Sequence, residues 1–144
     1  MGGAGNDTIY GNWIDGGKAG GRNIIVGGAG ADILYGYKVA DGAEGKGSIL
    51  IAGDTSLRIS QLQAVMTEWT STHPYAMQVQ NILGEGSGGS NGTNYLQPGV
   101  SVTNDAAVDQ LWGSTAGTGL NWFWYVLAVD QINRDKATEI HTAV

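Results

Sequence analysis

The stretch GGAGNDTIYG at residues 2–11 returns almost unchanged as GGAGADILYG at residues 27–36. Segments 2–26 and 27–51 align without a gap and match at ten of 25 positions, and a third copy begins at residues 52–54 and then stops. Self-similarity at a fixed period indicates a repeat architecture. The matching pairs are Gly2/Gly27, Gly3/Gly28, Ala4/Ala29, Gly5/Gly30, Asp7/Asp32, Tyr10/Tyr35, Gly11/Gly36, Gly17/Gly42, Gly20/Gly45 and Ile24/Ile49.

Each copy of the repeat predicts two short strands separated by glycine-rich turns. The predicted strands are Thr8–Tyr10 and Ile24–Val26 in the first copy, and Ile33–Tyr35 and Ile49–Ile51 in the second. Two strands per period fit one coil of a parallel solenoid, in which equivalent residues stack about 4.8 Å apart. We therefore expect a mainly β fold: a parallel, roll-like β-solenoid of two 25-residue coils, residues 2–26 and 27–51.

From residue 55 the pattern changes to helices and irregular strands. Ile59, Leu62, Met66 and Trp69 form an amphipathic helical stripe, and a second short helix is predicted from Pro74 to a stop at Gly84. A flexible loop (84–94) follows, then predicted strands at 100–103, 109–112 and 121–126 and an ambiguous tail. We expect residues 1–54 to form the repeats, and residues 55–144 to form a helical insert and a β cap on the C-terminal end.

Composition excludes several classes of function. The 144 residues include 25 glycines, yet 42% are hydrophobic, with five Trp and six Tyr, which favours an ordered core over disorder. A net charge of -6 argues against nucleic acid or an anionic membrane as partner. The absence of cysteine excludes disulfides and thiolate metal sites, and no apolar run approaches the length of a membrane span.

The repeated phrase also fits the nonapeptide pattern G-G-x-G-x-D-x-U-x, at residues 2–10 and 27–35. In this it resembles the RTX (repeats-in-toxin) family of secreted bacterial proteins, which implies a calcium-binding roll. Calcium binds six to eight carboxylate and carbonyl oxygens. The resemblance implies Ca²⁺ as the cofactor, with carboxylate ligands from Asp7 and Asp32 and carbonyl ligands from Gly3, Gly5, Gly28 and Gly30.

The chain departs from the family in two respects. Its repeat is 25 residues long, whereas the family's spacing is nine residues per strand and about 18 per coil, and Asn23 or Ser48 stands in the second strand where an aspartate is expected. A neutral residue there leaves one row of calcium sites and not two. The alternative interpretation is that Asp7 and Asp32 cap glycine turns by accepting backbone N–H bonds.

No catalytic motif is present, and we expect no enzymatic activity. His73 precedes a proline at a predicted helix start and His141 lies near the C-terminus, which favours surface roles, and Asp105 and Asp109 are interpreted as turn caps. The aromatic run 122–125 predicts a buried strand packed under the helices, with a sugar-stacking platform as the alternative. Asn91 is the more plausible of two glycosylation sequons, since it lies in the glycine-rich loop.

Together these patterns predict a calcium-binding structural module of a secreted or cell-surface bacterial protein. Phrases in residues 48–144 also resemble the tails that follow such repeats in large bacterial surface proteins. The uncovered first strand edge predicts head-to-tail self-association, including a filament, with no nucleic acid and no membrane insertion. A carbohydrate-binding or partner-binding module, and the C-terminal part of a larger secreted enzyme, are the alternatives.

Overall fold

The computed structural model describes residues 1–11, 13–14, 21–36, 38–39, 46–113, 118–133 and 136–144. In the first half of the chain the elements are β1 (Gly3–Ala4), β2 (Thr8–Tyr10), β3 (Trp13–Ile14), β4 (Asn23–Val26), β5 (Gly28–Ala29), β6 (Ile33–Tyr35), β7 (Lys38–Val39), β8 (Ser48–Ile51) and β9 (Asp54–Thr55). They are followed by α1 (Ile59–Trp69), α2 (Tyr75–Leu83), β10 (Val102–Thr103), β11 (Gln110–Trp112), β12 (Trp122–Tyr125), β13 (Gln131–Asn133) and β14 (Ile140–Ala143).

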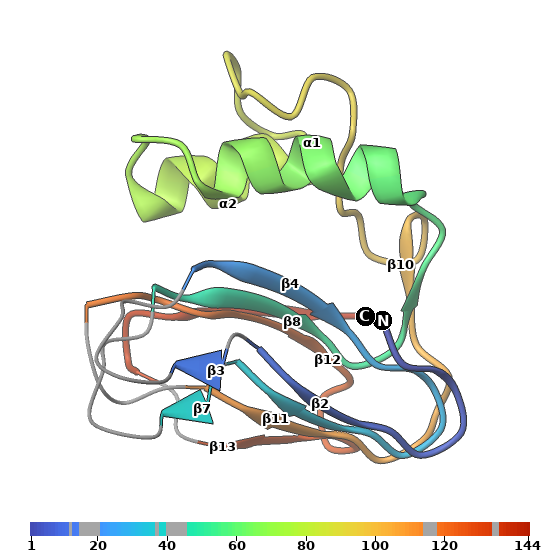
Figure 1. Ribbon diagram of the computed structural model, residues 1–144. Coiled ribbons are helices and arrows are strands. Elements are labelled where there is room, and N and C mark those ends of the chain that lie inside the picture. The colour runs from blue at the N-terminus through green and yellow to red at the C-terminus, as the bar shows by residue number, and fades with distance from the viewer. Residues whose placement is uncertain (12, 15–20, 37, 40–45, 114–117, 134–135) are drawn as a thin grey trace.

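Two four-stranded parallel sheets form the body of the molecule (Figure 1). One has the order β2-β6-β11-β13, and the other has the order β4-β8-β12-β14. The chain alternates between them and passes through both sheets four times: pass 1 is β2 and β4, pass 2 is β6 and β8, pass 3 is β11 and β12, and pass 4 is β13 and β14. Helices α1 and α2 cover the outer face of the second sheet, here called the covered sheet; the first is the exposed sheet.

The register between passes 1 and 2 is 25 residues at every described position. Thr8 pairs with Ile33, Asn23 with Ser48, and the short strand pairs β1-β5 and β3-β7 keep the same offset. This confirms the predicted stacking of the two copies. The matching pairs Gly17/Gly42 and Gly20/Gly45 lie outside the described residues.

The expectation of two coils closed by a separate cap is wrong. Strands β11, β12, β13 and β14 continue the same two sheets in parallel, so each sheet holds four strands and not two. Residue 54 therefore marks the start of the helical segment, and it does not mark a boundary between sheets. The helical segment is inserted between pass 2 and pass 3, and the predicted strands at 109–112 and 121–126 belong to pass 3.

The covered sheet separates two hydrophobic cores. Toward the helices it presents one set of alternate residues, and these pack with side chains of α1 and α2 such as Leu62, Val65 and Val79. Toward the exposed sheet it presents the other set, and these pack against Leu34 and Leu111. Burial on both faces explains why its strands read as continuous apolar runs. The set that faces the helices is Ile24, Val26, Ile49, Ile51, Trp122, Trp124 and Ile140. The set that faces the exposed sheet is Ile25, Leu50 and Phe123.

The two helices form where the apolar stripes predict them. Leu62 and Trp69 lie on the buried face of α1, and Trp69 packs against Trp122 with ring centroids 6.1 Å apart. Helix α2 ends at Gly84, whose φ of 84° gives the left-handed geometry that terminates many helices. The Tyr75 hydroxyl fixes α2 to the covered sheet, since it donates to Asn121 O and accepts from the N–H of Ile140.

Replacing Gly28 by alanine tests the stacking of pass 1 on pass 2. Gly3 and Gly28 have φ of 111° and 107°, so alanine is strained at both positions, by about 1–3 kcal/mol. Only at Gly28 would the new Cβ overlap another pass, at the carbonyl oxygen of Gly3; at Gly3 it meets nothing within 4 Å. We expect Gly28→Ala to lower the free energy of unfolding by at least about 1 kcal/mol more than Gly3→Ala, measured by urea denaturation. Equal losses would contradict the stacking.

Candidate functional site

Four aspartates stand in one column where the strands of the exposed sheet begin. Asp7, Asp32, Asp109 and Asp130 each directly precede a strand, and we call them the aspartate column. The backbone N–H of Asp7 donates to Asp32 Oδ1 at 2.7 Å, that of Asp32 to Asp109 Oδ1 at 2.7 Å, and that of Asp109 to Asp130 Oδ1 at 3.0 Å. The carboxylates of Asp32, Asp109 and Asp130 thus each cap the turn of the pass before. This is the turn-capping alternative for Asp32, whereas the Asp7 carboxylate accepts no backbone N–H from the described residues.

The aspartate column has a direction, and its two ends differ. At pass 4 the column is closed, because the N–H of Asp130 donates to Val126 O at 3.0 Å and Asp130 Oδ2 accepts the N–H of Val126 at 2.6 Å. At pass 1 Asp7 Oδ1, the counterpart of the oxygens that accept an N–H in the later passes, accepts no hydrogen bond from the described residues. The column is therefore terminated at its C-terminal end and open at its N-terminal end.

The aspartate column concentrates buried negative charge. Asp32 and Asp109 are 1% and 0% exposed, and Oδ2 of each has no hydrogen-bond partner in the described part of the chain. Burial raises the pKa of Asp109 to about 7. The hydrogen bond from the Asp32 N–H acts to lower this pKa, while the charges of Asp130, Asp105 and Asp32 raise it further. Burial also raises the pKa of Asp32. Protons or a cation would relieve this repulsion.

A second column runs along the covered sheet at the equivalent positions. Ser48 N–H donates to Asn121 Oδ1 at 2.9 Å, and Asn121 N–H donates to Glu139 Oε1 at 2.7 Å. In pass 1 the Asn23 amide donates to Ser48 Oγ at 3.2 Å. Three of these four residues are neutral, so this column repeats the capping without the accumulated charge.

The predicted calcium ligands are brought together only in part. Asp7 and Asp32 share a column, but Asp32 Oδ1 already accepts a backbone N–H, and Oδ2 of both residues is enclosed. The carbonyls of Gly3 and Gly5 point along the stack toward the Cα atoms of Gly28 and Gly30, and φ is positive at all four glycines. Within the described ranges no three histidine or acidic side chains are grouped to hold one metal ion. The enclosed Oδ2 atoms fit a cation chemically, but ligation requires the carboxylates to turn outward.

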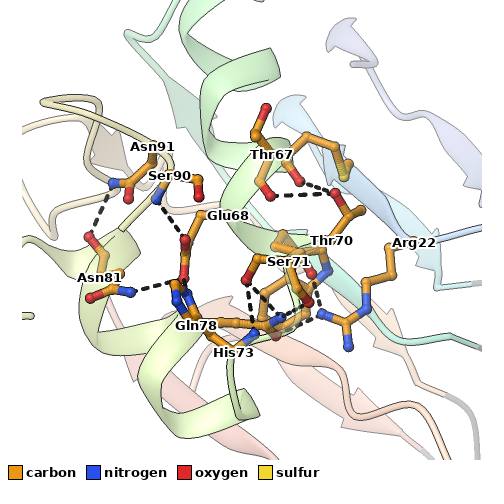
Figure 2. A network of polar contacts seen from close by, with 12 residues as sticks. Arg22, Thr67, Glu68, Thr70, Ser71, His73, Gln78, Asn81, Ser90 and Asn91 are labelled. Carbon is orange, nitrogen blue, oxygen red and sulfur yellow. Dashed lines mark hydrogen bonds and ion pairs between the residues drawn. The ribbon is translucent and has the colours of Figure 1, made fainter. Parts of the chain in front are cut away.

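A second buried acid, Glu68, organises the helical segment (Figure 2). It is fully buried; Oε1 accepts from the Asn81 amide at 2.9 Å and lies 2.8 Å from His73 Nδ1, while Oε2 accepts the N–H of Ser90 at 2.7 Å. Burial acts to raise the pKa of Glu68, but these three groups outweigh it and hold the pKa below its usual range. Glu68 therefore stays charged and ties α1, α2 and the loop together.

The glycine-rich loop 84–94 is held in place by this network, contrary to the prediction of a flexible loop. Asn91 is 1% exposed, and its amide donates to Asn81 O at 3.0 Å and to Asn94 O at 2.8 Å. Both hydrogens of the amide are used inside the protein, so a glycan on Asn91 is incompatible with this fold. The interpretation of Asn91 as a glycosylation site is wrong.

Arg22 links the repeats to the helical segment (Figure 2). Its guanidinium donates to Trp69 O and to Gln78 Oε1, the latter at 2.7 Å, and lies 4.9 Å from the centre of a Trp69 ring. Burial lowers the pKa of Arg22, opposed by Tyr75. The contacts place a cation from pass 1 against the end of α1.

The remaining candidate residues have structural surroundings. His73 pairs with Glu68, and the exposed His141 lies edge-on to Phe123 and Tyr125. Asp105 accepts the N–H groups of Gly30 and Ala107, which confirms the interpretation of a turn cap. Trp122 and Trp124 pack under the helices as predicted, while Phe123 faces the exposed sheet. All three are 0% exposed, so no sugar can stack on them.

The sequence contained a signal for part of what was missed. The sequence DQL at 109–111 recurs 21 residues later as DQI at 130–132, each time at the start of a strand. This recurrence identifies Asp130 as a member of the aspartate column. Glu139 follows Asn121 at a spacing of 18, without a shared motif. Glu68 lies within the first predicted helix, and no neighbouring motif in the sequence distinguishes it as a functional residue.

None of the protein-family models, curated proteins or solved structures compared with the chain matches it. Among the described helices, none is long and apolar enough to cross a membrane.

Neutralising Asp109 tests the charge of the aspartate column. Because its folded pKa is raised to about 7, the folded protein holds a proton that the unfolded chain releases between pH of about 4 and about 7. The contribution of Asp109 to stability is thus complete below pH 4 and is lost as pH rises through 7. Asp109→Asn keeps the Oδ1 acceptor but has no titrating carboxyl. As the pH rises, wild type should lose on the order of 2 kcal/mol of unfolding free energy through Asp109, and the variant should not show this loss. The measurement is urea unfolding across pH with a chelator present.

The control is Asp54→Asn, the same change at an exposed aspartate. It should leave the pH profile unchanged. If Asp109→Asn and wild type lose stability equally between pH of about 4 and about 7, the raised pKa is refuted.

Proposed function

We propose that the chain is a structural, non-enzymatic module of a secreted or cell-surface bacterial protein, in which the two parallel sheets are the walls of a short β-solenoid. The observation that carries this proposal is the register: passes 1 and 2 stack at a constant offset of 25 residues in both sheets. Each pass buries its apolar face against its neighbours, as in repeat proteins. Passes 3 and 4 extend the same two walls.

We further propose that the module associates with copies of itself, head to tail. Strands β2 and β4 form one edge of the two sheets, and β13 and β14 form the other. Unpaired edges of this kind are templates for further pairing. Joining β13 and β14 of one copy to β2 and β4 of the next continues both sheets with all strands parallel.

The joint between copies would be weaker than the joint between passes. Within the chain, the N–H of Asp7 or Asp32 reaches the carboxylate of the next pass. In pass 4 the N–H of Asp130 donates to Val126 O and that of Glu139 to Lys136 O, so neither is available to a neighbouring copy. Association should therefore depend strongly on concentration.

Calcium binding is the second part of the proposal. It is supported by the enclosed, unpartnered Oδ2 atoms of Asp7 and Asp32, together with the carbonyls of Gly3 and Gly5 directed between passes. A bound cation would supply the charge that the aspartate column lacks. Binding would then contribute to folding stability by mass action.

Lysine substitutions on the two edges test the self-association. Thr8 lies exposed on β2 and Gln131 lies exposed on β13, and a lysine on an edge strand opposes pairing. We expect wild type to show a mass that rises with concentration in analytical ultracentrifugation, and both Thr8→Lys and Gln131→Lys to remain monomeric. Thr93→Lys, an exposed loop position, is the matched control and should behave as wild type. A monomeric wild type at all concentrations, with and without calcium, would exclude self-association.

Calcium titration tests the metal. Calcium at millimolar concentration should raise the melting temperature of wild type, followed by circular dichroism, and give binding heat in calorimetry. The double variant Asp7→Asn, Asp32→Asn should show neither effect, with magnesium as the ionic control. Equal responses of wild type and variant, or no response of wild type, would remove calcium from the proposal.

A further inference from the structure

An apolar pocket lies beside the edge of the covered sheet, under α1. Its volume is about 300 Å³, and its lining comes from α1, from the edge strand β4 and from the N-terminal residue. Ile59 and Met1 are 63% and 57% exposed there, which is unusual for large apolar side chains in one patch. The lining residues are Met1, Ile24, Ile59, Leu62, Gln63 and Met66.

The pocket lies where a row of core residues ends. Ile24, Ile49, Trp122 and Ile140 share one register position in the covered sheet, and all contact the core under the helices. Parallel strands are about 4.8 Å apart, so one more strand beside β4 would place the next member of this row next to Ile24 and α1. That place is the pocket.

Met1 occupies the neighbouring position of such an added strand. The N–H of Gly2 donates to Val26 O at 3.0 Å, as the N–H of Gly27 donates to Ile51 O at 2.9 Å. Met1 therefore lies next to Val26 across the edge of the covered sheet, in the same relation that Val26 has to Ile51 in the following pass. A residue two positions earlier on the same strand would be in register with Ile24 and would enter the pocket.

We propose that the pocket is a docking site for one large aliphatic side chain of a further repeat coil, which pairs its strand with β4 in parallel. The inference rests on the proposed role of the open edge and names the partner that fits it best. A cavity of about 150 Å³ already holds a benzene ring, so this pocket has ample room for an isoleucine or leucine side chain.

The aspartate column identifies the partner as a coil of the G-G-x-G-x-D type. In Asp32, Asp109 and Asp130 the oxygen Oδ1 accepts the N–H of the aspartate one pass earlier, whereas Asp7 Oδ1 accepts no hydrogen bond from the described residues. A further repeat coil supplies such an N–H. Pass 4 of another copy does not, because the N–H of Asp130 already donates to Val126 O. A repeat coil should thus bind this edge more tightly than the C-terminal edge of a second copy.

The test adds one further coil to the full chain. A second copy of residues 2–26 is inserted between Met1 and Gly2, so that its isoleucine corresponding to Ile24 reaches the pocket. We expect the melting temperature to rise by about 3 °C or more and the added copy to resist protease. The change Ile24→Ser in the added copy should abolish most of the rise, and Ile24→Leu should keep it.

Ile59→Asp in the pocket separates docking from general stability. In the unextended chain Ile59 is largely exposed, so the substitution should shift the melting temperature by less than about 2 °C. In the extended chain it should remove most of the gain from the added copy. This non-additivity is the signature of a contact between α1 and the added coil.

Three outcomes would overturn the inference: no stabilisation by the added copy, digestion of the added copy as an unfolded extension, or stabilisation that is indifferent to both Ile24→Ser and Ile59→Asp. A stabilised, pocket-dependent extension of a chain that is itself strictly monomeric would support the inference while removing self-association from the proposed function. Stabilisation together with continued self-association would support both, because the added copy of residues 2–26 again presents the edge strands equivalent to β2 and β4.

Discussion

The bond from each aspartate N–H to the carboxylate of the next pass is the interaction on which the stack depends. It lies where the strands of the exposed sheet begin, and a buried N–H without a partner there is costly. It also fixes register, because a shift by one residue would turn every inward side chain of the sheet outward. Leu34 and Leu111 reach the inner core only in this register.

The same interaction gives the molecule a polarity. Each N–H finds its acceptor in the pass that follows, so the last pass must satisfy its own N–H groups, and Asp130 and Glu139 do so through local turns. The first pass instead presents an acceptor. The helical segment reinforces this polarity, since α1 packs on the covered sheet and leaves an apolar pocket beyond its first strand. The pairing that we propose is therefore expected at β2 and β4.

The repeat predicts the strands β2, β4, β6 and β8 to within one residue, and the apolar stripes predict α1 and α2, because both depend on local periodicity. The sequence predicts a cap in place of passes 3 and 4 for a physical reason. Their column members are 21 and 18 residues apart, and the helical segment separates them from pass 2, so no constant period connects them to the repeat. Glu68 was missed because its partners Asn81 and Ser90 are distant in sequence. The sequence identifies Asp7, Asp32 and Asp109 as candidates. Whether a carboxylate caps a turn or binds a metal ion depends on the direction of each oxygen atom, which the sequence does not specify.

The two columns show why charge, and not capping, is the unusual property of the exposed sheet. Ser48 and Asn121 stack by hydrogen bonds at no electrostatic cost, whereas Asp32 and Asp109 do the same with buried carboxylates whose second oxygens have no partner in the described structure. Capping alone would be served by asparagine. A proton and a cation relieve the same repulsion, so each should weaken the need for the other. Where the pH lies well above 7 and Asp109 is ionised, the stack gains most from a cation. The Asp7 carboxylate, at the first-pass end of the column, is where a cation or donor from outside the chain would reduce the repulsion.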